Sequence, residues 1–536
     1  MMRASSSSDP AGSSEIAALG TGDIAVSELT LRGHLARHPE DTATLTRLAE
    51  AIRDQGRPAE AIPLFRQVLH LTPDAHPVRI SLARLLQQLG DPNLALAEVR
   101  ALPSAVRTTF DARTFEAAVL ASLGRHEQQA EIYEKLLSKH PGNARLWMVL
   151  GNALVYAGRI TQAVRALRRS VSIQSAFGEG WWSLANMKTV RLDPSDRAQM
   201  REALSGNLGP ADALHLQFAL GKALEDCGEY AESFHHYAEG NRIGAAGFPA
   251  EQMSPDRLID DVDGAVATFD RPLFDRLAGL GHPARDPIFI VGLQRSGSTL
   301  IEQILASHSL IEGTSELDAM LHIWVDLCRT AERSGRTVWQ EIGKLDGQRL
   351  TEIGAEYLER TRPYRRTDRP FFIDKRPANW IYAGLIRLIL PNATIIDARR
   401  HPMACGFSNF KQHYAGGLPF SYSLPLMGRY YAEYLRLMNH LDQVQPALAH
   451  HLLNEQLIDD PEGEIRRLLD FVGVPFESAC LDFHQNRRTV RTPSAEQVRR
   501  PINRAGVDQW RHYEPWLGSL KEALGPALTS WAAEKS

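Results

Sequence analysis

Two glycines, an arginine and three hydroxyl residues stand together in the segment 292–299, which reads GLQRSGST. The apolar run PIFIV precedes it at 287–291, a pattern typical of a strand that is buried on both faces. Apolar residues at helical spacing follow at 300–305, so a helix is expected to begin near Ser298. This arrangement predicts an anion site, because the first backbone N–H groups of a helix have no partner within it. Arg295 adds a permanently charged, bidentate donor inside the turn.

The kind of anion follows from a comparison with the Walker phosphate loop, G-x-x-x-x-G-K-[ST]. Gly292, Gly297 and Thr299 fit this pattern, but Ser298 stands where the loop requires lysine. That lysine reaches the β- and γ-phosphates, so a magnesium triphosphate is a poor fit. A nucleotide with one 5′-phosphate and a small charged leaving unit fits better.

Two further apolar runs end in charged residues. The run 371–373 is followed by Lys375, and the run 393–396 is followed by Asp397 and Arg400. Open α/β sheets place their chemistry at the carboxyl ends of parallel strands. We therefore expect these charges to lie at the same edge of the sheet as the anion-binding turn.

Together these segments resemble the sulfotransferases that use 3′-phosphoadenosine 5′-phosphosulfate (PAPS), whose phosphosulfate loop reads G-x-P-R-S-G-[ST]-T between a strand and a helix. The resemblance extends from about Asp286 to Trp510. It looks like the bacterial branch related to the tyrosylprotein sulfotransferases. It implies a P-loop-like α/β domain with a mainly parallel central sheet, which binds PAPS without a metal and releases adenosine 3′,5′-bisphosphate.

The resemblance also assigns residues to the donor. The phosphate loop would hold the 5′-phosphosulfate, a strand-end arginine and the serine eight residues after it would hold the 3′-phosphate, and a segment near the C-terminus would cover the cofactor. The cofactor-binding residues implied in this way are Arg295, Ser296, Gly297, Ser298, Thr299, Arg400, Ser408, Ser494 and Arg500. The chain departs from the family pattern at His401, Gln412, Asn454 and Gln509.

The catalytic residues implied by the resemblance are Glu316, Lys375, Arg295 and Ser494. Glu316 matches the acidic residue proposed as the base in tyrosylprotein sulfotransferases to within one position, with Glu312 as the alternative. A carboxylate suits this role, since it can take the acceptor proton as the oxygen attacks sulfur. The other three side chains would stabilise charge on the departing phosphate and the sulfuryl oxygens.

The N-terminal half repeats with a period of 34 residues, marked by Gly56, Gly90, Gly124 and Gly158. This period matches the tetratricopeptide repeat, in which paired helices leave an apolar face that the next pair covers. The predicted architecture is an α-solenoid followed by the α/β domain. Its parts are a disordered N-terminus (1–23), the repeat array (24–244), connecting helices (245–285) and the sulfotransferase domain (286–536).

Composition narrows the function classes. The net charge of −4 does not suggest nucleic-acid binding, and the four cysteines lack metal-site spacing. No apolar run reaches the length of a membrane span, and the N-terminus lacks the apolar region of a secretory signal. A cytoplasmic protein without a metal is therefore expected.

Several alternatives stay open. The repeat groove would bind an acceptor peptide or a protein partner, or would serve as a passive spacer or as the surface of a homodimer. The acceptor would be a protein tyrosine or a small hydroxyl compound, and the aromatic segment 414–436 would line its cleft or belong to a helix core. A P-loop kinase or NTPase, with Asp397 as a magnesium ligand, and a non-catalytic scaffold are the competing functions.

Overall fold

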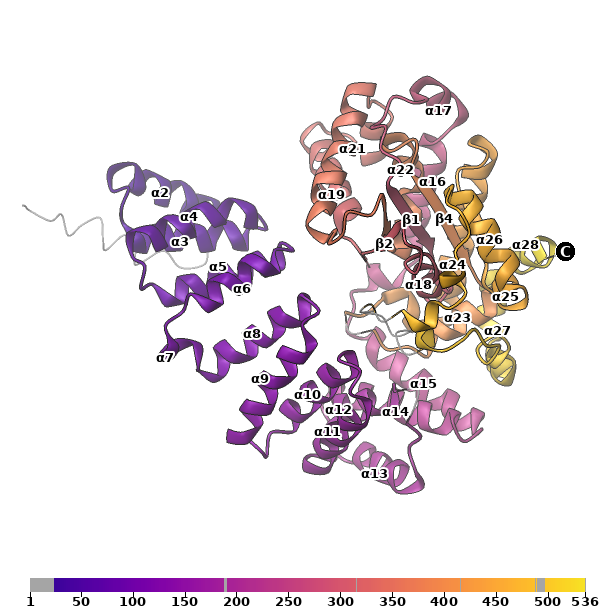
Figure 1. Cartoon of the computed structure of the whole chain (residues 1–536), viewed down its shortest axis with the longest axis horizontal. Helices are drawn as coiled ribbons and strands as arrows, with labels where there is room; N and C mark the ends of the chain where they lie inside the picture. Colours follow the sequence, from indigo (N-terminus) through magenta and orange to yellow (C-terminus); the bar gives the residue numbers. More distant parts are fainter. Residues whose placement is uncertain are drawn as a thin grey trace, which may run out of the picture. The chain divides into compact units, whose positions relative to one another are not determined.

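A computed structural model describes residues 24–187, 190–314, 316–414, 416–486, 488 and 497–535 (Figure 1). The chain divides into two compact units, Met1–Ile173 and Gln174–Ser536. None of the helices in these described ranges combines the length and the apolar character that crossing a membrane requires.

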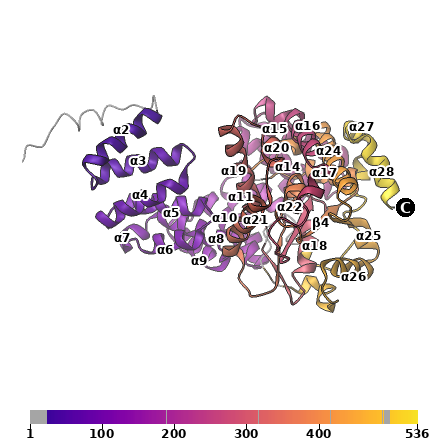
Figure 2. The same ribbon diagram turned by 90° about the horizontal axis from the view of Figure 1, so that it is seen from above.

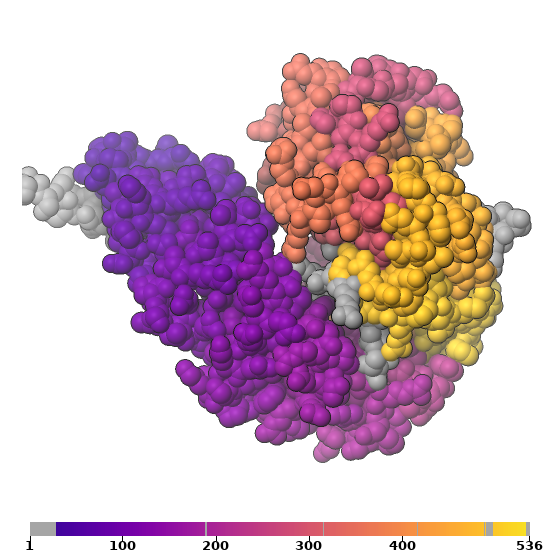
Figure 3. Space-filling model, viewed as in Figure 1, coloured from indigo at the N-terminus to yellow at the C-terminus, as the bar shows by residue number. Residues whose placement is uncertain are grey.

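The first unit is a succession of paired helices, which can be followed in two views (Figures 1 and 2). They are α2 (Ile24–Arg37), α3 (Thr42–Asp54), α4 (Pro58–Leu71), α5 (His76–Gln88), α6 (Pro92–Arg100), α7 (Ser104–Arg107), α8 (Phe110–Ser122), α9 (His126–Lys139), α10 (Ala144–Tyr156) and α11 (Ile160–Ile173). Side chains fill the spaces between them, so that this unit presents a continuous surface (Figure 3).

The 34-residue period corresponds to the turns between paired helices. Gly56, Gly90, Gly124 and Gly158 all have φ between +70° and +84°, a left-handed conformation that glycine adopts without steric cost. Five residues after three of these glycines, alanines with no exposed surface let the helices approach closely. The predicted helical repeats are confirmed.

The second unit begins with further helices, the first four of which end at Ala245. They are α12 (Gly178–Ala185), α13 (Pro194–Ser205), α14 (Pro210–Glu225) and α15 (Tyr230–Ala245), followed by α16 (Asp256–Thr268) and α17 (Arg271–Leu277). The compact division falls between α11 and α12, and the bounds of the repeat array, 24–244, stay a prediction. Helices α12 to α15 thus share a compact unit with the C-terminal sheet.

That sheet has five strands in the order β2-β3-β1-β4-β5. The strands are β1 (Pro287–Gly292), β2 (Ile311–Gly313), β3 (Phe371–Asp374), β4 (Thr394–Arg399) and β5 (His450–Leu453). Every pairing is parallel; Ile290 of β1, for example, lies opposite Ile396 of β4. The predicted parallel central sheet is confirmed.

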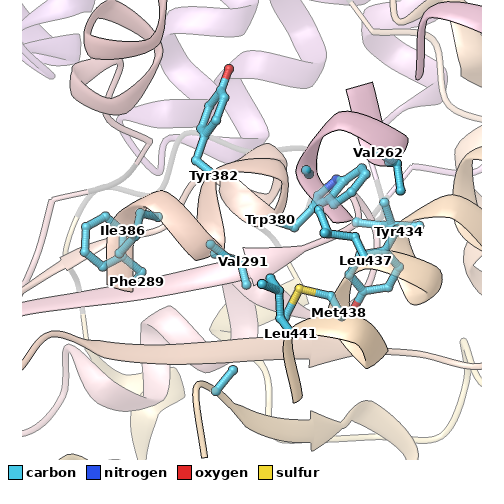
Figure 4. Close-up of a cluster of buried hydrophobic side chains, with 14 of the residues drawn as sticks. Val262, Phe289, Val291, Trp380, Tyr382, Ile386, Tyr434, Leu437, Met438 and Leu441 are labelled. Carbon is cyan, nitrogen blue, oxygen red and sulfur yellow. The ribbon is translucent and has the colours of Figure 1, made fainter. Parts of the chain in front are cut away.

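Alternate side chains of β1 enter two different cores. Phe289 and Val291 face helices α19 (Ala319–Arg333), α21 (Gly347–Thr361), α22 (Ala383–Ile389) and α24 (Leu424–Val444). Figure 4 shows these two side chains among residues of α22 and α24. Ile288 and Ile290 face α18 (Ser298–Leu305) and α26 (Pro461–Val472) on the other side. All six residues of β1 are buried, as the apolar run predicted.

The remaining elements of the unit are short or lie at its periphery. They include η3 (Pro377–Tyr382), α23 (Pro402–Phe410), α25 (Asn454–Asp459), η7 (Gln497–Arg499), η8 (Gln509–Trp516), α27 (Gly518–Leu524) and α28 (Pro526–Lys535). Parallel strands bring their carboxyl ends to one edge of the sheet, which is where the loop 292–297, Lys375 and Arg400 lie.

Candidate active site

The turn between β1 and α18 has an unusual backbone. Gly292, Arg295 and Gly297 all have positive φ, at +130°, +68° and +101°. For arginine this is a costly conformation, of a kind that is concentrated at functional sites. A Cβ atom at Gly297 would lie 2.7 Å from Oδ1 of Asn454, so only glycine fits there. Helix α18 begins at Ser298, as predicted.

Helix α23 supports the turn from outside. Asn409 has no exposed surface, and its Nδ2 donates to the carbonyl oxygen of Gln294 at 2.8 Å. Nε of Arg295 donates to Oγ of Ser408 at 3.0 Å, and Nη1 of Arg400 donates to the carbonyl oxygen of Arg295 at 3.1 Å. These contacts join the residues predicted for the 5′-phosphosulfate to those predicted for the 3′-phosphate. Asn409 was missed by the sequence analysis.

A cavity of about 380 Å³ lies beside this turn. The predicted donor-binding residues that line it are Arg295, Gly297, Ser298, Thr299, Arg400, Ser408 and Arg500. Ser296 is absent from that lining and is only 2% exposed. Burial lowers the pKa of Arg400.

The polar atoms of this region fit a nucleotide with two phosphate groups. Nε of Arg400 and Oγ of Ser296 are buried and have no hydrogen-bond partner among the residues that the structure describes. Three arginines and the N-terminus of α18 face one cavity, which is the donor set that phosphate oxygens require. Within the described ranges, no group of three or more His, Cys, Asp or Glu side chains is placed to hold a metal ion.

The predicted catalytic carboxylate and lysine are in contact. Nζ of Lys375 lies 2.5 Å from Oε1 of Glu316. The lysine side chain is 1% exposed and the glutamate side chain is 51% exposed, so this ion pair opens to solvent on the carboxylate side. Neither residue lines the cavity of about 380 Å³.

The end of β3 holds the segment that carries Glu316. Oγ1 of Thr314 donates to the carbonyl oxygen of Ile373, and the backbone N–H of Leu317 donates to Oδ1 of Asp374 at 3.4 Å. Burial raises the pKa of Asp374 to about 7, against the lowering effect of a hydrogen bond from Tyr357. Glu316 is therefore positioned by the strand end that precedes Lys375.

Segments in both halves of the chain match known protein families. Residues 287–478 match the sulfotransferase family, and residues 16–76, 53–119 and 144–177 match tetratricopeptide repeats. The chain carries tetratricopeptide repeats and a sulfotransferase-family domain.

Individual relatives cover only parts of the chain. An uncharacterized protein of Aquifex aeolicus is 32% identical over 317 residues, which is 57% of this chain and 41% of that protein. The chain spans less than half the length of the curated relatives that it matches.

Two solved structures are also similar to parts of this chain. The sulfotransferase domain from the olefin synthase of Synechococcus PCC 7002 is 23% identical and covers 43% of this chain and 89% of its own, with a TM-score of 0.32. A crystal structure of MamA protein is 21% identical and covers 34% of this chain and 94% of its own, with a TM-score of 0.28.

Glu312 and Asp397, the alternative base and the alternative magnesium ligand, each contact neighbouring groups of the sulfotransferase-family domain. Glu312 is 8% exposed, and its carboxylate accepts hydrogen bonds from the backbone N–H groups of Arg366 and Thr367 at 2.7 and 3.1 Å. Burial would raise the pKa of Asp397, but Arg399 and His451 lower it to about 2. Both carboxylates thus bind groups of the domain itself, Glu312 the 366–367 backbone and Asp397 the side chains of Arg399 and His451.

Several other predicted features have defined places. Tyr431 and Tyr434 belong to the core, each 1% exposed, so this part of the aromatic segment 414–436 is helix core and does not line a cleft. At two departures from the family pattern, the ring of His401 stacks on Trp510 with centroids 5.1 Å apart, and Asn454 lies beside Gly297. Ser494 lies outside the described residues.

Proposed function

We propose that the sulfotransferase-family domain transfers a sulfuryl group from PAPS to an acceptor hydroxyl. The observation that carries the proposal is the contact between the two phosphate-binding sets. Arg295 of the loop is bonded to Ser408 and Arg400, and all three line one cavity. A site for a single phosphate would not need cations and donors from both β1 and β4.

When bound, PAPS supplies an activated sulfuryl group on its 5′-phosphate. The N-terminal N–H groups of α18, Arg295, Ser298 and Thr299 hold the phosphosulfate. Arg400 and Ser408 hold the 3′-phosphate and so fix the nucleotide in one direction. Placement and charge then do most of the work, as in phosphoryl transfer.

Glu316 accepts the proton of the acceptor hydroxyl as its oxygen bonds to sulfur. Arg295 and Lys375 stabilise the negative charge that grows on the phosphate oxygen as its bond to sulfur breaks. The ion pair between Lys375 and Glu316 keeps the two groups that handle opposite charges next to each other.

The acceptor that we propose is a tyrosine of a peptide, which the repeats bind directly or through a protein partner. The resemblance to tyrosylprotein sulfotransferases and the presence of tetratricopeptide repeats support this proposal. A small hydroxyl compound is the alternative acceptor. The cytoplasmic location and the homodimer stay predictions.

Calorimetric titration with adenosine 3′,5′-bisphosphate, with ATP and magnesium as competitor, tests the donor class. We expect tight binding that EDTA does not change and that Arg400→Ala removes. Binding of ATP–magnesium without bisphosphate would support a kinase, and binding of neither nucleotide would support a scaffold.

A further inference from the structure

Helix α14 lies outside the segment that matches the sulfotransferase family, yet it forms one wall of the donor cavity. Lys222, Glu225 and Asp226, all near its C-terminal end, line the cavity together with Arg400 and Ser408. Nothing in the phosphate-loop chemistry requires two carboxylates beside a site for anions. Their presence calls for a physical explanation.

Glu225 is the centre of a hydrogen-bonded cluster. Its side chain is 4% exposed, and its two carboxylate oxygens lie 3.2 and 3.0 Å from Nζ of Lys411. Nε2 of Gln509 donates to Oε1 of Glu225 at 2.8 Å, and the hydroxyl groups of Tyr237 and Tyr513 each donate to Oε2 at 3.3 Å. Donors from α15, η8 and the end of α23 therefore fix this carboxylate.

Lys411 is well placed to meet the second phosphate. It follows Ser408 by three residues, and its backbone N–H still bonds to the carbonyl oxygen of Phe407, so the helical turn continues to it. Residues three apart on a helix lie on the same face. Its ammonium group also donates to Oε1 of Gln509 at 2.7 Å, and Lys411, Gln509 and Ser408 all line the cavity.

The charge of Lys411 explains why the carboxylate of Glu225 lies beside an anion site. Burial lowers the pKa of Lys411, and the adjacent Glu225 opposes that effect. The carboxylate thus favours the charged form of the Lys411 ammonium group. It also neutralises that charge, so an arriving phosphate must compete with Glu225 for Lys411.

We propose that Glu225 sets the affinity of the donor cavity for the second phosphate, because it holds the Lys411 ammonium group in the cavity and competes with that phosphate for it. This inference rests on the proposed function. According to this inference, Lys411 contacts the 3′-phosphate together with Arg400 and Ser408. Glu225 is then a positioning residue that acts through Lys411. Helix α14 thereby belongs to the donor site.

The test measures the affinity of the full chain for two nucleotides by calorimetry. Adenosine 3′,5′-bisphosphate carries the second phosphate, and adenosine 5′-monophosphate lacks it. Lys411→Met is expected to weaken bisphosphate binding roughly 10- to 100-fold, the range for a lost hydrogen bond to a charged group, and to change monophosphate binding less than about threefold. Glu225→Gln is expected to tighten bisphosphate binding about tenfold, since Lys411 is then no longer paired with a charged carboxylate and its ammonium group can bond to the phosphate instead.

Asp226→Asn is the matched control. Asp226 caps the same helix, lines the same cavity and pairs with Lys222, whose Nζ also lies 3.7 Å from Oε1 of Glu225. The variant makes the same change in net charge and leaves the pair of Glu225 and Lys411 in place. Equal tightening by Asp226→Asn and Glu225→Gln would show a general field effect and overturn the proposal. The gain from Glu225→Gln should also shrink in a Lys411→Met background; an unchanged gain there would show that Glu225 acts directly on the ligand.

Failure of this inference and failure of the proposed function give different results. A wild-type protein that binds no bisphosphate refutes both. A wild-type protein that binds bisphosphate and loses it in Arg400→Ala, while Lys411→Met weakens both nucleotides equally or neither, refutes only the role of Lys411 and Glu225. If Glu225→Gln does not fold, the Lys411→Met comparison decides the matter.

Discussion

Replacing Glu316 with glutamine separates catalysis from donor binding in this domain. A general base typically contributes to turnover by a factor of about 10² to 10⁴, so the variant should lose that much sulfuryl transfer. Glu316 does not line the donor cavity, so the affinity for adenosine 3′,5′-bisphosphate should change less than about threefold.

The effect on stability can be bounded from the ion pair. The amide oxygen of glutamine can still accept a hydrogen bond from Lys375, and Glu316 is half-exposed, so water screens the lost charge. The free energy of unfolding should fall by about 1 kcal/mol or less. For a unit of this size that corresponds to a fall in Tm of about 2 °C. A hundredfold loss of turnover could not come from unfolding of this magnitude.

Glu312→Gln is the control, because Glu312 is the other carboxylate near this position. Its oxygens bind the 366–367 backbone, so the variant should lower the free energy of unfolding by about 1–3 kcal/mol while the folded protein keeps its turnover. The assay is transfer of radiolabelled sulfate from PAPS, with bisphosphate titration and thermal unfolding on the same samples. Full activity of Glu316→Gln together with loss in Glu312→Gln would refute the assignment of the base.

Three further predictions concern single residues of the sulfotransferase-family domain. Gly297→Ala should lower the free energy of unfolding by about 1–3 kcal/mol in urea, because a Cβ at this positive φ meets the side-chain amide of Asn454. A second substitution that removes the Asn454 amide should recover part of this free energy. Burial lowers the pKa of His451, but hydrogen bonds with Asp397 and Asp442 outweigh that effect and raise the pKa from 6.5 to about 9. The stabilisation by His451, up to about 3 kcal/mol, is therefore complete below pH 6.5 and is lost as pH rises through 9, and His451→Gln should flatten this dependence in urea midpoints. Ser408→Ala removes the acceptor of Arg295 and should weaken bisphosphate binding about tenfold by calorimetry, whereas unchanged binding would place the second phosphate elsewhere.

The parts of the fold that the sequence predicted are those with local signals. The strand β1, the turn and the start of α18 follow from an apolar run, two glycines and helical spacing within about twenty residues. The turns of the repeats could be predicted from glycines at a fixed period, since each of these glycines has a left-handed backbone conformation.

Features that depend on packing between distant segments could not be predicted from the sequence. Glu225 and Lys411 are 186 positions apart, and neither stands in a recognisable motif. Spacing alone left a cleft open beside the more common helix core for Tyr434, and the structure shows that its hydroxyl donates to the buried carboxylate of Asp397. Glu312 and Glu316 are both acidic residues near one glycine, and their contacts distinguish them: Glu316 binds Lys375, whereas Glu312 binds the 366–367 backbone.

The strained backbone of Arg295 shows why a short motif can specify the donor site only within its fold. A left-handed arginine costs free energy, of the order of 1–3 kcal/mol, and persists only where its surroundings determine it. Here Asn409 holds the carbonyl group of the preceding residue, Arg400 holds that of Arg295, and Ser408 holds its side chain. All three supports come from the strand end and helix that follow β4, so the order of strands in the sheet fixes the shape of the loop. The segment 292–299 therefore predicts phosphate binding, and the neighbouring strand brings beside it Arg400 and Ser408, the residues proposed for the second phosphate.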